Sequence, residues 1–346
     1  MIRLALPLGL ASAALLFDAP TELSTDYARK VTWKVSSERS FSLETLESSM
    51  EIDGEPVERG GMGGGGSEDV RAVSFTHTIL EHAAGEPTAV RRVFGEVAGE
   101  GLMRFGENEM ETTAESPFEG AEIEWRMEDG TPVAEVIDGD VEEEGLDAFT
   151  FGLALDNFLP AGEVEPDATW ELDGELFLQA LGLDLEATLF PPAPPEESEE
   201  GGRGGGRRGG FRGGRSGGID ALLGLDWDVE VTFAEASVDS DWGPAARLTF
   251  EAEGSGDPPA RGGRGGPGGG GGESSTEGSV TANLEGELLF LLDGRHPVHF
   301  ECGGTVGIES TTIRSTGRGE MVMTNVQEGQ LSLAITVEQV IEDDGE

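Results

Sequence analysis

The sequence has almost no cysteine and almost no lysine. Its single cysteine, Cys302, cannot form an internal disulfide, and no cysteine follows the apolar N-terminal run to carry a lipid. Two lysines, Lys30 and Lys34, stand against 69 acidic residues, and the formal net charge is -47. A surface of this sign repels nucleic acid and anionic membrane faces, so we expect no nucleic-acid partner. It favours a salty or outward-facing environment, and the alternative is a surface that captures cations or a basic partner.

Long hydrophobic runs are also scarce. The run Leu4–Leu16 follows Arg3 and ends among small residues, which is typical of a secretory signal peptide, here residues 1–19. It is shorter than the ~20 residues of a transmembrane helix, although an uncleaved anchor is the alternative. We therefore expect an exported protein, periplasmic or extracellular, with no transmembrane segment after signal cleavage.

Catalytic motifs are missing as well. The Gly-x-Ser-x-Gly pattern occurs at Gly214–Gly218, but within a predicted Gly-rich loop and not after a predicted strand, so it indicates no nucleophile elbow; no phosphate-binding loop ends in Gly-Lys-Ser/Thr. Cys302 lies among residues expected to face inward, which indicates an inert thiol rather than a Cys–His nucleophile. The sequence predicts a non-enzyme without cofactor or metal. A calcium site near Asp138–Asp140 stays open, although it lacks the order of a binding loop, and the histidines lack metal-ligand spacing: His77, His82, His296, His299.

What the sequence does have is apolar residues with a period of two, which is the pattern of half-buried strands. Trp33 and Val35 share one face near the N-terminus, and Asp129-Gly130 marks a hairpin turn between two alternating runs. Closely following strands pair antiparallel. We predict a mainly β protein of antiparallel meander sheets, a half-barrel or a sandwich, in two β-rich halves with one or two helices between them.

The chain divides by composition. Residues 20–140 form an N-terminal β-rich half, and 141–190 hold a helix predicted over Val141–Phe158, then a Leu-Pro/Trp crossover and a short helix or strand end at Leu176–Leu183. Residues 191–218 form a Pro/Gly/Arg-rich flexible loop, and 219–346 a C-terminal β-rich half with a flexible Gly-rich loop at 254–278. The matching Asp-Gly turns at 129–130 and 293–294 allow, but do not require, an internal duplication.

The Arg-Gly-Gly repeats of the two Gly-rich loops resemble RNA-binding segments, with Phe211 as a stacking residue. The two loops together hold seven arginines and seven acidic residues, so they are neutral. We interpret them as surface loops whose arginines pair with acidic surfaces.

Aromatic residues at strand spacing are usually core, but a sheet packed on a helix can also leave an apolar cavity. The residues predicted to line one and to bind a ligand are Trp125, Phe149, Leu153 and Trp170.

The crossover Phe158–Leu172 carries Leu159-Pro160, Val164 and Thr169-Trp170. It resembles a loosely defined group of uncharacterised exported bacterial proteins with a central Leu-Pro…Val…Thr-Trp motif, in which Asp167 stands where the group tends to have glycine. The layout is also distantly similar to half-barrel periplasmic lipid carriers. The group implies no activity.

Three functions follow as expectations. The first is a non-enzymatic exported protein that binds an apolar or lipid-like ligand, or an envelope partner, between sheet and helix. The second is a structural or interaction protein of the cell surface that uses its Arg/Gly-rich loops. The third is a hydrolase with no recognisable motif. The oligomeric state is open.

Overall fold

The computed structural model describes residues 20–27, 31–57, 65–106, 108–142, 145–146, 149–191, 219–258, 274–316 and 319–340. The predicted signal peptide and most of both Arg/Gly-rich loops lie outside these residues.

The described chain is mainly β, as predicted, with short helices between its two β-rich stretches. The first stretch consists of β1 (Thr21–Glu22), β2 (Thr32–Ile52), β3 (Glu55–Pro56), β4 (Gly65–Ala83), β5 (Glu86–Phe105), β6 (Asn108–Glu115), β7 (Glu122–Glu128) and β8 (Thr131–Asp138). The middle contains the 3-10 helix η2 (Ala154–Phe158), β9 (Glu163–Val164), β10 (Thr169–Glu171), α1 (Gly174–Ala180), α2 (Glu186–Leu189) and α3 (Ile219–Leu222). The second stretch consists of β11 (Asp226–Ser240), β12 (Gly243–Gly256), β13 (Ser274–Leu291), β14 (His296–Thr316) and β15 (Gly319–Val340). The described helices are all too short or too polar to cross a bilayer.

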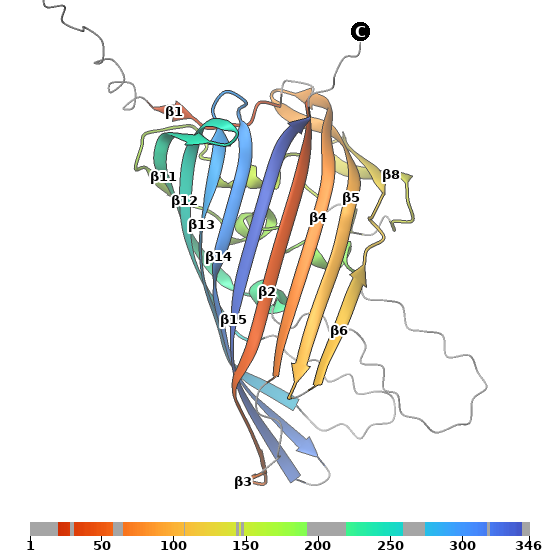
Figure 1. Ribbon diagram of the computed structural model, residues 1–346, viewed down its shortest axis with the longest axis vertical. Coiled ribbons are helices and arrows are strands. Elements are labelled where there is room, and N and C mark those ends of the chain that lie inside the picture. The colour runs from red at the N-terminus through yellow and green to blue at the C-terminus, as the bar shows by residue number, and fades with distance from the viewer. Residues whose placement is uncertain are drawn as a thin grey trace, which may run out of the picture.

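Both stretches belong to one curved antiparallel sheet, with the strand order β10-β11-β12-β13-β14-β15-β2-β4-β5-β7-β8 (Figure 1). The last strand β15 pairs with β2 from Met321↔Ile52 to Val340↔Thr32, so strands from the two ends of the chain meet in the middle of the sheet. Of the two predicted arrangements, a half-barrel or a sandwich, the single curved sheet agrees with the half-barrel. A separate two-stranded sheet joins β1 to β9.

The alternating pattern explains why these segments form strands and where the core lies. Buried residues recur every second position in β2 from Trp33 to Leu43, and in β15 from Gly329 to Val337. This inward face packs against the middle segment, whose helices lie on the concave side of the sheet (Figure 1). The same strands continue past the core, through residues 44–52 of β2 and 319–328 of β15, with no buried residues in either segment.

The predicted hairpin at Asp129-Gly130 is confirmed. Glu128 pairs with Thr131, and both turn residues have positive φ, 51° and 81°, as a two-residue type I′ turn requires. The second Asp-Gly sequence forms a different turn, because Leu291 pairs with His296 and four residues lie between them. The two turns therefore share a sequence but not a geometry.

The helix predicted over Val141–Phe158 is wrong. Its described residues contain no α-helix: Ala154–Phe158 forms a 3-10 helix, and Leu146 also has 3-10 geometry. Gly145 adopts φ 87°, which an α-helix does not allow, and Gly152 lies where a Cβ would be 2.8 Å from the Tyr27 hydroxyl. The second candidate, Leu176–Leu183, contains the end of helix α1, capped by Asp173, whose side chain accepts from the Glu175 and Leu176 amides.

The limits of the Gly-rich loop 254–278 are also corrected. Strand β12 continues to Gly256, and β13 begins at Ser274, so both ends of the predicted loop are sheet. Glycine is the residue that allows this packing: Gly254 lies against the Leu225 and Trp227 side chains, where a Cβ would come within 3.0 Å.

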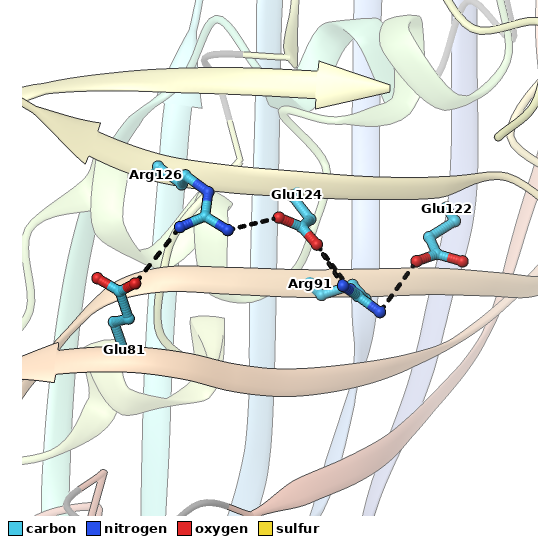
Figure 2. A network of polar contacts seen from close by, with 5 residues as sticks. All are labelled: Glu81, Arg91, Glu122, Glu124 and Arg126. Atoms are coloured by element: carbon cyan, nitrogen blue, oxygen red, sulfur yellow. Dashed lines mark hydrogen bonds and ion pairs between the residues drawn. The ribbon is translucent and has the colours of Figure 1, made fainter. Parts of the chain in front are cut away.

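On the outer face, ion pairs join β4, β5 and β7 (Figure 2). Arg91 contacts Glu122 at 3.2 Å and hydrogen-bonds to Glu124, which also accepts from Arg126 at 2.9 Å; Arg126 reaches Glu81 at 3.4 Å. Burial alone would raise the pKa of Glu124, but the hydrogen bonds from the two arginines outweigh it, and its pKa lies below the usual value. The carboxylate therefore stays ionised and ties β5 to β7.

The outer face of the other half carries like charges directly opposite each other. Glu171 pairs with Glu230, Glu230 with Glu251, and Glu251 with Glu285, and all four are exposed. Such pairs destabilise a sheet.

Replacing one member of this row should stabilise the protein. We expect Glu251→Gln to raise the free energy of unfolding by about 0.5–1 kcal/mol at low salt, and the gain to shrink in 1 M NaCl as salt screens the repulsion. Urea unfolding at both salt concentrations measures it. Glu55→Gln is the control, because the residue opposite Glu55 is Ile52. A gain that does not depend on salt would contradict the electrostatic origin.

Phe158 is fully buried, and its ring centroid lies 5.1 Å from that of Phe250 and 5.2 Å from that of Phe300. Trp170 is only partly buried, in the edge strand β10. Phe158→Ala should therefore cost about 3–5 kcal/mol of stability, and Trp170→Ala clearly less. Denaturant unfolding compares them, and equal losses would show that the packing of Phe158 is misassigned.

Candidate ligand-binding site

A cavity of about 120 Å³ lies between the inward face of the sheet and the middle segment. Its floor comes from the four central strands β15, β2, β4 and β5, so it straddles the pairing of β15 with β2. Its roof comes from the chain around η2 and α1–α2. The apolar lining residues are Val35, Val73, Phe75, Phe94, Phe149, Leu153, Ala154, Leu155, Ala180, Leu181, Leu185, Leu189, Phe190, Leu333, Ile335 and Val337.

Three arginines interrupt this apolar lining. Arg39 and Arg71 stand directly opposite each other on β2 and β4, and both contact Asp69, at 3.7 and 2.7 Å. The Arg71 guanidinium also lies 4.9 Å from the centroid of the Phe190 ring. The carboxylate of Asp69 therefore already contacts the guanidinium groups at this end of the cavity.

Arg92 lies nearer the other end, on β5, and is 4% exposed. Its register partner is His77, which lies six residues from Arg71 along β4. At 3.4 Å per residue, the two ends of the cavity are therefore about 20 Å apart along the strand. The Nε of Arg92 donates to Nδ1 of His77 at 3.1 Å, and its Nη2 donates to the Thr150 carbonyl at 2.5 Å and, more weakly, to that of Gly152 at 3.5 Å. These bonds attach the irregular roof to the sheet.

Burial and charge set the protonation of this pair. Burial lowers the pKa of Arg92 to about 10, partly offset by Tyr27, so the guanidinium is charged at neutral pH. Burial, and then the charge of Arg92, hold the pKa of His77 well below its usual value. His77 is therefore neutral and accepts through Nδ1.

The N-terminal segment is held against the roof by a buried carboxylate. Asp156 accepts from the Thr25 hydroxyl at 2.6 Å and from the Tyr27 hydroxyl at short range. The Tyr27 oxygen accepts in turn from the amide of Leu153 at 2.7 Å. Burial raises the pKa of Asp156 to about 6, although both hydroxyl contacts act in the opposite direction.

The four residues predicted to line a cavity are not all together. Phe149 and Leu153 line it. Trp125 lies behind Phe149, with the ring centroids 5.3 Å apart, and its Nε1 donates to the Leu146 carbonyl at 2.8 Å. Trp170 lies in β10 at the edge of the sheet, paired with Val231 and away from this lining.

The other candidate residues have structural surroundings. Cys302 is buried, and burial raises the pKa of its thiol to about 12, so it stays protonated. His299 stacks on Trp242 at 5.1 Å and contacts Glu301. Among the described residues, no group of three or more His, Cys, Asp or Glu could hold a metal ion, Asp138 and Asp140 included.

The motif of the crossover has a clear backbone role. Asp167 adopts φ 66°, the left-handed conformation that glycine adopts most readily and aspartate tolerates. The aspartate therefore preserves the turn that a glycine at this position would make.

None of the three arginines was among the residues predicted to line the cavity. Their signal was available: Arg92 stands between Val90 and Phe94 on the apolar side of an alternating strand, and both neighbours are buried. A charge on the apolar face of a predicted strand marks either a buried ion pair or a site.

Comparisons with known proteins add little. No family model matches the chain, and no curated protein matches it. Among solved structures, an outer membrane channel from Pseudomonas putida F1 aligns with 95% of this chain and 100% of its own, at 9% identity and a TM-score of 0.21. OpdQ from Pseudomonas aeruginosa aligns with 90% of this chain and 98% of its own, at 9% identity and a TM-score of 0.18. These scores are too low to transfer a fold or a property.

The buried Asp156 predicts a pH dependence of stability. The usual pKa is 3.8 and the folded value is about 6, so between them the folded state binds more protons than the unfolded state. The free energy of unfolding must then fall as the pH rises through this window. Relative to Asp156→Asn, the wild type should lose about 2 kcal/mol between pH 4 and pH 6.5, which is most of the roughly 3 kcal/mol that 1.36 kcal/mol per pKa unit gives over the whole titration.

Denaturant unfolding at a series of pH values measures the difference between the two proteins. Asp241→Asn is the control, because Asp241 is exposed. A difference that stays flat with pH would show that Asp156 is not buried as a protonatable carboxyl.

Proposed function

We propose that this chain is a non-enzymatic, exported β protein that binds an apolar or lipid-like ligand between its sheet and its middle segment. The observation that carries the proposal is the cavity of about 120 Å³, with apolar side chains on both its floor and its roof. Concave, mostly apolar spaces with a few polar groups are typical of small-molecule sites. The exported location rests on the apolar run Leu4–Leu16 behind Arg3.

The size of the cavity limits the ligand. An apolar cavity of about 150 Å³ in another protein takes one benzene, and this cavity is smaller, so a single ring or a short acyl chain is the largest ligand that we expect without rearrangement. A longer chain requires the roof to move. The roof is suited to this, because the described residues between Phe149 and Leu153 form no strand or α-helix and are attached by side chains such as Arg92 and Tyr27.

The test is to fill the cavity from its floor. Ser37 lines the cavity on β2, and its neighbour Ser36 lies on the opposite face of the strand. We expect 1-hexanol to raise the melting temperature of the wild type and of Ser36→Leu. Ser37→Leu should lose this shift, because leucine occupies the space.

Native mass spectrometry of protein purified from its own host should also show a bound small molecule in the wild type and less of it in Ser37→Leu. Equal hexanol shifts in the two leucine variants would place the binding elsewhere. No shift in any of the three proteins, together with no bound molecule, would overturn the proposed function.

A further inference from the structure

We propose that the ligand of this cavity carries an anionic headgroup, and that Arg92 receives it. The inference rests on the proposed function, because it names the headgroup of the same ligand. The class is a compact amphiphile with a carboxylate or phosphate at one end and an apolar body at the other.

The charge of Arg92 is not compensated by a carboxylate among the described residues. All acceptors of its hydrogen bonds are neutral: His77 Nδ1 and the carbonyls of Thr150 and Gly152. Within the part of the chain that the structure describes, no carboxylate forms an ion pair with it. A buried charge without an opposite charge costs several kcal/mol, and arginines are almost never fully buried unless paired.

Aromatic rings surround the guanidinium group of Arg92 and hold it in place. The guanidinium carbon lies 5.1, 5.4 and 5.6 Å from the ring centroids of Phe75, Trp125 and Phe149. Aromatic faces attract a cation without neutralising it. The rings and the neutral acceptors therefore fix the orientation of the guanidinium, and its positive charge remains available to an anion.

One hydrogen-bond donor of Arg92, its Nη1, remains available. Nε and Nη2 make the hydrogen bonds of Arg92, and among the described residues nothing accepts from Nη1. Arg92 is itself part of the cavity lining. A ligand carboxylate or phosphate in the cavity would accept from this donor in a charge-assisted hydrogen bond.

The two ends of the cavity differ in this respect. At the other end, Arg39 and Arg71 already contact the carboxylate of Asp69. Two guanidinium groups share one carboxylate there, whereas Arg92 contacts no carboxylate among the described residues, so the proposal places the anionic group at Arg92 and the apolar body toward Ser37 and Ile335.

The experiment compares ligands that share a hexyl body. Isothermal titration calorimetry at pH 8 measures binding of hexanoate, hexyl phosphate, 1-hexanol and hexylammonium to the wild-type chain. We expect at least one anion to bind about tenfold or more tightly than 1-hexanol, as a hydrogen bond to a charged group provides, and hexylammonium to bind least. The two anions distinguish a carboxylate from a phosphate headgroup.

The variants assign the preference to one residue. Arg92→Gln should reduce the preference for the anion over 1-hexanol to less than about threefold. Arg91→Gln is the matched control: it removes the same charge from the adjacent residue, which lies on the outer face, and should keep the preference.

Each outcome decides between the two proposals. If 1-hexanol binds and the anions bind no better, the inference is wrong and the proposed function stands. If an anion preference persists in Arg92→Gln, Arg92 is not its receptor. If no ligand binds the wild type, both fall. If Arg92→Gln does not fold, the comparison of ligands on the wild type still tests the anion preference. Arg92→Lys, which retains the positive charge, should retain most of the preference for the anion over 1-hexanol.

Discussion

The pairing of β15 with β2 is the constraint on which the rest of the structure depends. It joins strands from the two ends of the chain along the whole register from Thr32 to Ile52, and it turns two β-rich stretches into one curved sheet. The cavity floor lies across this pairing, with Val35 and Ser37 on one side and Ile335 and Val337 on the other. Loss of this pairing would therefore open the core and the site together.

The middle segment meets this sheet largely without sheet hydrogen bonds of its own. Its buried backbone groups still need partners, and side chains supply them: Arg92 for Thr150, Trp125 for Leu146 and Tyr27 for Leu153. Polar residues in the core are thus attachment points between sheet and roof. Arg92 differs from the other two because it brings a full charge, which attachment alone does not require. That difference connects the fold to the proposed ligand chemistry.

The sequence predicted what depends on local pattern. Alternation around Trp33 and Val35 marked a buried strand face, and Asp129-Gly130 marked a hairpin that the structure contains. The pairing of β15 with β2 joins residues nearly the whole chain apart, and no local signal reports it. The helix over Val141–Phe158 was wrong because apolar spacing was weighed above Gly145 and Gly152. Phe149 and Leu153 were found as cavity lining; Arg92 was not, because its strand was judged by its apolar residues alone.

The central claim is that a ligand lies between sheet and roof with its anionic end at Arg92. A crystal soaked in 6-bromohexanoate tests it most directly, because bromine scatters anomalously and marks the apolar end of the molecule. The account predicts a bromine peak between Leu153 and Ile335, with the carboxylate within hydrogen-bond distance of Arg92. A peak outside this cavity, or a carboxylate turned toward Arg39 and Arg71, would contradict it.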